Sequence, residues 1–128
     1  MSELPTPKGY SHVVEATGSR LVFISGQLPL RPDRSVVSDD FGEQVRQAFA
    51  NLGTALAQAG AGWEHVVKLG IFVTELEGLA DLRAIRDEFV HVASPPASTL
   101  VQVVSLAAPG AKVEIEAIAV CDERLDVK

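Results

Sequence analysis

The 128-residue sequence predicts one α+β domain, residues 1–128, in which two helices pack on one face of a mixed β-sheet. Two segments repeat apolar residues at steps of three and four, which is the period of an amphipathic helix. Short β-branched runs bounded by glycine, proline and polar residues predict strands before, between and after them. The length suits a single domain, and no repeat or linker divides the chain. The second face of the sheet also carries apolar residues, so we expect it to contact another subunit.

The first strands are expected before the first helix. Residues 1–9 show little periodicity and are expected to form an extended lead-in. His12–Thr17 and Leu21–Ser25 predict a hairpin around the turn Gly18-Ser19. Val36 and Val37 are expected to add a short strand.

Both helices are predicted from their apolar faces. The first spans residues 41–59, where Asp40 and Glu43 have the spacing of a capping box and Gly60 supplies the stop. The second is expected over residues 79–90. The apolar faces consist of Phe41, Val45, Ala48, Phe49, Leu52, Leu56 and Ala59 in the first helix, and Leu79, Leu82, Ile85, Phe89 and Val90 in the second.

Three later segments predict strands. His65–Thr74 is apolar at odd and even positions, which is typical of a central strand covered on both faces. Ser94-Pro95-Pro96 ends the second helix, because proline lacks a backbone donor and restricts the residue before it. Thr99–Leu106 and Lys112–Cys121 then predict two strands joined by the turn at residues 108–110.

Charge and hydropathy limit the classes of partner. The formal net charge is −6, and the 11 lysines and arginines form no basic stripe, so nucleic acid is disfavoured. No apolar run approaches the ~20 residues that a membrane span needs, so no membrane partner is expected. The mean hydropathy of +0.20 is high for a small monomer, and association between copies of the chain would bury the excess.

Cysteine usage and the N-terminus predict the compartment. Cys121 is the single cysteine and follows an apolar run, so it is interpreted as a structural thiol in a reducing environment. Residues 1–5 have neither the basic nor the apolar region of a secretory signal. We therefore expect a cytoplasmic protein.

Five stretches in register resemble the RidA/YjgF family, also called L-PSP. The resemblance runs from about Tyr10 to Val120, in the family's order. The stretches are Phe23–Pro29, Asn51–Gly60, Val66–Val73, Pro96–Val101 and Val113–Val120.

This resemblance implies a chorismate-mutase-like (RidA/YjgF) fold, with a six-stranded mixed sheet and two helices on one face. It also implies a homotrimer with three equivalent clefts between subunits, each open to a small-molecule metabolite. The best-known activity of the family is a deaminase reaction, the hydrolysis of reactive enamines and imines left by pyridoxal-phosphate enzymes to a 2-oxo acid and ammonia. No metal or other cofactor is implied.

Glu114 is the catalytic candidate. It lies two residues from Glu116 in an expected strand, so both side chains point to one face. A solvated pair would explain them, although Ile118 and Val120 continue this face and predict that part of it is covered. The resemblance gives the first glutamate of the Glu-x-Glu pair the role of holding a water, which suits hydrolysis of a C=N bond. Glu116 is interpreted as structural.

Ser98 departs from the family pattern that the resemblance implies. Deaminating members have arginine here, and its guanidinium binds a substrate carboxylate through two parallel hydrogen bonds that serine cannot form. Ser98 is either a strand-start residue or a hydroxyl in the cleft. Arg83 matches a position near the family cleft. However, Arg83 and Arg86 lie on the face of the second helix opposite its apolar face, which favours a position on solvated helix surface. Lys68, in a central strand, is expected to reach a carboxylate or the cleft.

Three further substrate-binding candidates come from the resemblance. Tyr10 matches a pocket tyrosine, although Gly9 replaces the usual proline, and an interface aromatic is the alternative. Ser25 and Gly26 match positions where a hydroxyl and a backbone N–H face the ligand, and glycine allows close approach. The histidines show no metal-ligand spacing, so no metal site is expected.

Two function classes stay open. One is an enzyme that hydrolyses an enamine, an imine or a related C=N metabolite, with Glu114 positioning water. The other is a non-catalytic trimer that binds a metabolite. The acidic balance argues against a third class, the endoribonuclease activity by which some members of the family are labelled.

Overall fold

In the computed structural model, which describes residues 3–123, four strands form a mixed sheet in the order β1-β4-β2-β3. The β1-β4 and β2-β4 pairs are antiparallel, whereas β2 and β3 are parallel. β1 and β3 are therefore the two edges of the sheet. The strands are β1 (Arg20–Gln27), β2 (Val66–Val73), β3 (Ala97–Gln102) and β4 (Val113–Cys121).

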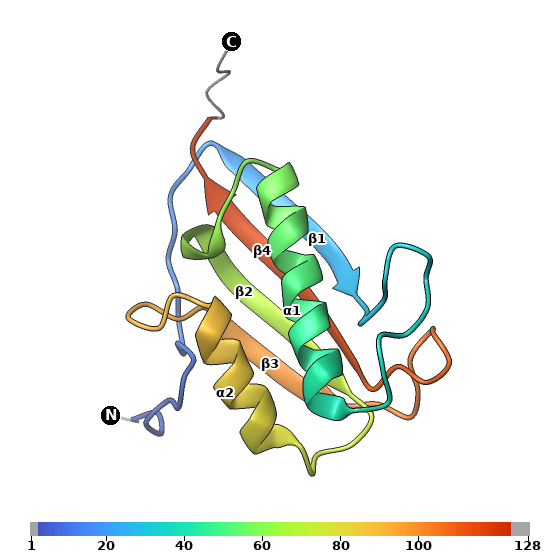
Figure 1. Cartoon of the computed structure of the whole chain (residues 1–128). Coiled ribbons are helices and arrows are strands. Elements are labelled where there is room, and N and C mark those ends of the chain that lie inside the picture. The colour runs from blue at the N-terminus through green and yellow to red at the C-terminus, as the bar shows by residue number, and fades with distance from the viewer. Residues whose placement is uncertain (1–2, 124–128) are drawn as a thin grey trace.

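Two helices cover one face of this sheet (Figure 1). α1 (Phe41–Gln58) begins after Asp40, whose carboxylate accepts a hydrogen bond from the N–H of Glu43 at 2.9 Å. α2 (Leu79–Phe89) packs beside α1, and a 3-10 turn, η1 (Trp63–His65), leads into β2. The expected α+β class, with two helices on one face of a mixed sheet, is confirmed.

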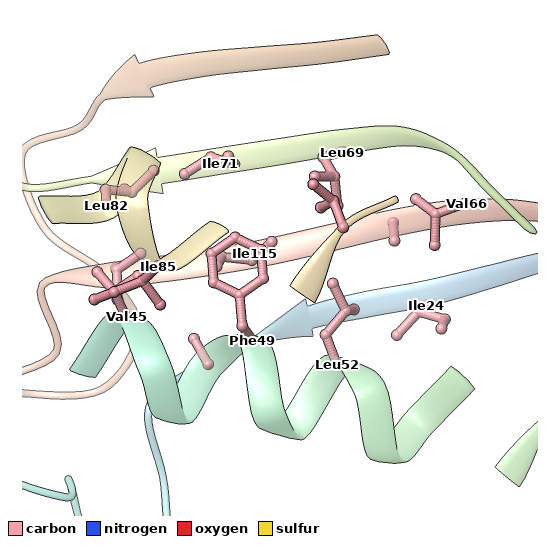
Figure 2. Packing of buried hydrophobic residues seen from close by; sticks show 14 of the residues in the cluster. Ile24, Val45, Phe49, Leu52, Val66, Leu69, Ile71, Leu82, Ile85 and Ile115 are labelled. Atoms are coloured by element: carbon pink, nitrogen blue, oxygen red, sulfur yellow. The ribbon is translucent and has the colours of Figure 1, made fainter. Parts of the chain in front are cut away.

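The core lies between the helices and the sheet. Figure 2 shows Phe49 and Leu52 pointing from α1 toward the strands. Phe49 is fully buried and stacks on Phe89 of α2 at a ring-centroid distance of 5.4 Å. Alternate residues of β4 face the helices and are buried, namely Val113, Ile115, Ala117, Ala119 and Cys121.

The expectation of six strands is wrong, because the described residues form four. Residues 12–17 do not pair with β1. Ser11 bridges to Ala97 at the start of β3, and Gly18 lies against the carbonyl of Cys121 at the end of β4. The segment between them therefore crosses the ends of the strands instead of running alongside one. Val36 makes only an isolated bridge to Leu30.

The face opposite the helices carries exposed apolar side chains. Leu21 and Phe23 of β1 are 66% and 70% exposed, and Val101 of β3 is 41% exposed. Leu21 and Phe23 pair with Val120 and Ile118 of β4, which are half-buried on the same face. Within residues 3–123, no helix has both the length and the apolar composition needed to cross a bilayer.

Candidate functional site

Glu114 lies against the backbone of Gly26 where β1 ends. The pairing of β1 with β4 is irregular between Ile24 and Gln27, so Gly26 lies outside the regular ladder. A Cβ atom at residue 26 would overlap the Oε2 atom of Glu114 and would lie 2.7 Å from its Cδ atom. Glycine is therefore the residue that lets the half-buried Glu114 carboxylate rest here.

Glu116 has a similar neighbour on the other side of β4. It pairs with Gly70 of β2, and a Cβ atom there would lie 2.8 Å from the Glu116 Oε2 atom. Both glutamates occupy the sheet face that the helices leave free, as their spacing predicts. Glu116 is exposed, whereas Glu114 is half-buried. The two carboxylates thus have similar surroundings but differ in burial. Glu114 contacts the end of β1, whereas Glu116 contacts β2.

A second group of candidates lines a cavity of about 310 Å³ between α2 and β3. Ser98 pairs with the buried Leu69 in the parallel ladder, which places it on the helix-covered face of the sheet. The cavity brings together Tyr10, Arg83 and Ser98, which are distant in sequence. Its lining consists of Thr6, Lys8, Tyr10, Ile71, Arg83, Arg86, Ser98 and Leu100.

The N-terminal segment forms one wall of this cavity. The N–H of Ser11 donates to the carbonyl of Pro96 at 3.0 Å, and the Ser11 hydroxyl donates to the carbonyl of Pro95. These bonds fix the chain beside the start of β3. Thr6, Lys8 and Tyr10 of the preceding stretch, which bends at residues 8–10, then line the cavity.

Arg86 is not on solvated helix surface, where its sequence position led us to expect it. Its side chain is only 9% exposed, and its Nε atom donates to Oδ1 of Asp87 at 3.0 Å. Arg83 is exposed as expected, and it lines the same cavity. The sequence signal that was missed is Gly9, which stands directly before Tyr10 and accommodates the Arg86 guanidinium.

The sequence-predicted residues fall into two groups within one chain. Tyr10, Arg83 and Ser98 meet in the cavity at the β3 edge. Glu114 and Gly26 meet at the β1 edge, on the opposite face of the sheet. Ser25 is exposed beside Gly26. A single copy of the chain therefore does not bring the Glu114 carboxylate to the cavity.

Lys68 contacts no carboxylate among residues 3–123, and it does not line the cavity. Its Nζ atom donates to the hydroxyl of Thr99 at 2.7 Å, on the face of the sheet that carries no helix. Within one chain, Lys68 therefore supplies no cation to the cavity that Ser98 lines. Among residues 3–123 there is also no cluster of three His, Cys, Asp or Glu side chains arranged to hold a metal ion.

Asn51 of α1 positions the chain that follows Gly26. Its Nδ2 atom donates to the carbonyls of Leu28 and Leu30, both at 3.0 Å. These bonds hold the wall of a hollow of about 470 Å³ that Gly26, Arg31 and Asn51 help to line. Periodicity does not reveal this role, but asparagine inside a helix is a poor helix former whose side chain competes for backbone groups.

The chain matches a known protein family along most of its length. The family model described as Endoribonuclease L-PSP matches residues 1–121. A RutC family protein from Aquifex aeolicus is 38% identical over 127 residues, which cover 94% of this chain and 99% of that protein. The 2-iminobutanoate/2-iminopropanoate deaminase of Salmonella typhimurium is 36% identical over 102 residues, covering 78% and 79% of the two chains.

A solved structure supports the same relationship. The Rid-family protein YyfB from Yersinia pestis, described as of unknown function, superposes with a TM-score of 0.83 at 35% identity. The match covers 88% of this chain and 86% of that one.

Proposed function

The chain belongs to the RidA/YjgF family, also described as Endoribonuclease L-PSP, and from this premise we propose that it hydrolyses a small enamine or imine. An enamine first tautomerises to the imine. Water then adds to the C=N carbon, a C–O bond forms, and the π-electron pair moves to nitrogen, which takes a proton. Collapse of this adduct breaks the C–N bond, releases ammonia and leaves a C=O group. The reaction balances without an oxidant or a reductant.

Glu114 is the residue that positions and partly deprotonates the water. Its carboxylate occupies the space that a side chain at Gly26 would fill, so it lies directly against the backbone at the end of β1. This contact is the observation that carries the proposal. A general base must lie within hydrogen-bonding reach of the water that it activates, and a half-buried carboxylate beside open backbone meets that need.

The complete cleft forms between copies of the chain, in a homotrimer. Two observations support this assembly: the cavity and the Glu114 carboxylate lie at opposite edges of the sheet, and the helix-free face exposes Leu21 and Phe23. A closed ring can bring the β1 edge of one copy to the β3 edge of the next. Light scattering should then give about three times 13.6 kDa, whereas a monomer at micromolar concentration would contradict the shared cleft.

Ser98 favours a second candidate function, a non-catalytic trimer that binds a metabolite. In this proposal, serine stands where the deaminating members of the family have their carboxylate-binding arginine. Loss of that group would weaken substrate binding without closing the cavity. An endoribonuclease is less supported, because the net charge of −6 opposes the binding of a polyanion.

Replacement of Glu114 separates the two candidates. Glu114→Gln keeps the shape and the hydrogen-bonding capacity but removes the base, so it should lower the rate of imine hydrolysis by roughly 10²–10⁴-fold. A pyridoxal-phosphate dehydratase can supply the imine while the release of 2-oxo acid is followed. Glu116→Gln is the matched control, since Glu116 also lies over a glycine but is exposed. Equal, small effects of both changes would favour the binding protein.

A further inference from the structure

Arg86 presents free hydrogen-bond donors to the cavity between α2 and β3. Its side chain is 9% exposed and lines that cavity. The Nε atom is occupied by Asp87, while Nη1 and Nη2 make no hydrogen bond within the described part of the chain. No buried side-chain nitrogen of residues 3–123 lacks a partner, so Nη1 and Nη2 are at least partly open to solvent.

Gly9 leaves room for this guanidinium because it has no side chain. Its φ is +80°, a conformation that favours glycine. A Cβ atom at residue 9 would overlap Nη2 of Arg86 and would lie 2.8 Å from its Cζ atom. The bonds of Ser11 to Pro95 and Pro96 hold the segment in place. The backbone and the absent side chain of Gly9 thus fix where the guanidinium lies.

The lining of the cavity is positively charged. Lys8 and Arg83 add two cations to Arg86, and the described residues that line the cavity include no aspartate or glutamate, although Asp87 pairs with Arg86 from outside this lining. A buried charge without a full set of partners is unfavourable, so the cavity should attract an anion. A planar guanidinium with two free terminal nitrogens matches the two oxygens of a carboxylate. Tyr10 and Ser98 supply hydroxyl groups beside it.

We propose that Arg86 binds the carboxylate of the substrate and is the cation that makes arginine unnecessary at position 98. The inference rests on the proposed function and names its substrate class, which is imines that carry a carboxylate. The 2-oxo acid product shares that carboxylate. The cation comes from α2, and Gly9 fixes its position. A residue of this helix, and not a residue of β3, therefore gives the specificity for an anion.

Calorimetric titration of the full-length protein with 2-oxobutanoate, and with its neutral methyl ester, tests this inference. Arg86→Gln should weaken the binding of 2-oxobutanoate roughly 10- to 100-fold, the usual effect of removing a charged hydrogen-bond partner. It should leave the binding of the ester nearly unchanged. Arg83→Gln is the control on the same helix and should weaken the acid less, because Arg83 is exposed.

Gly9→Ala provides an independent variant that keeps Arg86 in the protein. Its methyl group displaces the guanidinium, so the binding of 2-oxobutanoate should fall while that of the ester persists. Arg86→Lys keeps the charge without the planar fork and should give an intermediate affinity. Circular dichroism shows whether each variant is folded, and the lysine variant serves if the glutamine variant unfolds.

Three results would overturn the inference. They are no binding of 2-oxobutanoate by the wild type, equal affinity in Arg86→Gln, or an equal loss of acid and ester in the folded variants. Binding of the oxo acid requires no turnover, so its presence without imine hydrolysis would refute the proposed function and leave this inference standing. Imine hydrolysis at an unchanged rate in Arg86→Gln would refute this inference and leave the proposed function standing.

Discussion

Gly26 and Glu114 are in direct contact across the irregular end of the β1-β4 pair, and the carboxylate occupies the space of the missing side chain. The φ of Gly26 is not in the left-handed region, so alanine is compatible with its backbone. Its methyl group would instead push the carboxylate away from the end of β1. The contact therefore tests the position of Glu114 without removing it.

Gly26→Ala should lower the rate of imine hydrolysis by at least about tenfold, because displacement of a general base by about 1 Å is enough for a loss of this order. The protein should stay folded, because the atoms that move are at the end of the Glu114 side chain, which is only half-buried. Gly70→Ala makes the same change beside Glu116 and should affect the rate less. If both alanine variants lose activity equally with unchanged melting temperatures, the special position of Glu114 is refuted.

Gln44 makes a prediction about stability. It is fully buried at the start of α1, where Nε2 donates to the carbonyls of Ser38 and Gly110 at 2.8 and 3.0 Å. Its Oε1 atom accepts the N–H of Lys112 at 2.7 Å. Gln44→Leu would leave these three backbone groups without their partner, so it should lower the free energy of unfolding by roughly 3 kcal/mol.

Urea denaturation measures this loss. Gln47→Leu is the matched control, because Gln47 is only half-buried and donates to another side chain, Oδ1 of Asn51, at 2.9 Å. It should cost less than half as much. An equal cost for both changes would show that the buried hydrogen bonds of Gln44 contribute little.

The ion pair between the helices predicts a dependence of stability on pH. Arg46 of α1 contacts both carboxylate oxygens of Glu88 of α2, at 2.6 and 3.1 Å. This hydrogen-bonded pair lowers the pKa of Glu88 below its ordinary 4.5. A lowered pKa means that the pair stabilises the fold above pH 4.5 and that this contribution is lost as the pH falls through the folded-state pKa.

The wild type should therefore be slightly more stable than Glu88→Gln at pH 7, and the difference should close on acidification below pH 4.5. The effect is small, since both side chains are about half-exposed. Thermal melts across this pH range measure it, with Glu77→Gln as the control, a carboxyl without an ion pair among the described residues. A difference that widens on acidification would contradict the assigned role of the pair.

The sequence predicts the elements with a strong period and misses contacts that depend on a distant segment. α1, α2, β2 and β4 lie where the apolar patterns place them. The two short strands expected at residues 12–17 and 36–37 do not join the sheet. Strand pairing depends on where a segment lies in the tertiary structure, and residues 12–17 have a suitable composition but cross the ends of the strands. The same limit applies to Arg86, whose burial depends on Gly9, far away in sequence, and not on the periodicity of α2.

The last prediction joins the two positions from which a cation can reach the cavity. Ser98 on β3 and Arg86 on α2 line the same space of about 310 Å³, so an arginine at residue 98 would meet the Arg86 guanidinium. Sequence alone predicts that Ser98→Arg raises activity on carboxylate-bearing imines. With Arg86 present, the second guanidinium should add little, because two like charges in a small cavity repel each other.

The change should instead rescue Arg86→Gln. The double variant Ser98→Arg/Arg86→Gln should recover most of the affinity for 2-oxobutanoate that Arg86→Gln loses, so the effects of the two substitutions are not additive. Titration of the wild type, both single variants and the double variant closes the cycle. The methyl ester again serves as the neutral control. If Ser98→Arg improves the affinity of the wild type and of Arg86→Gln by the same factor, the two cations act independently, and Arg86 does not take the place of an arginine at position 98.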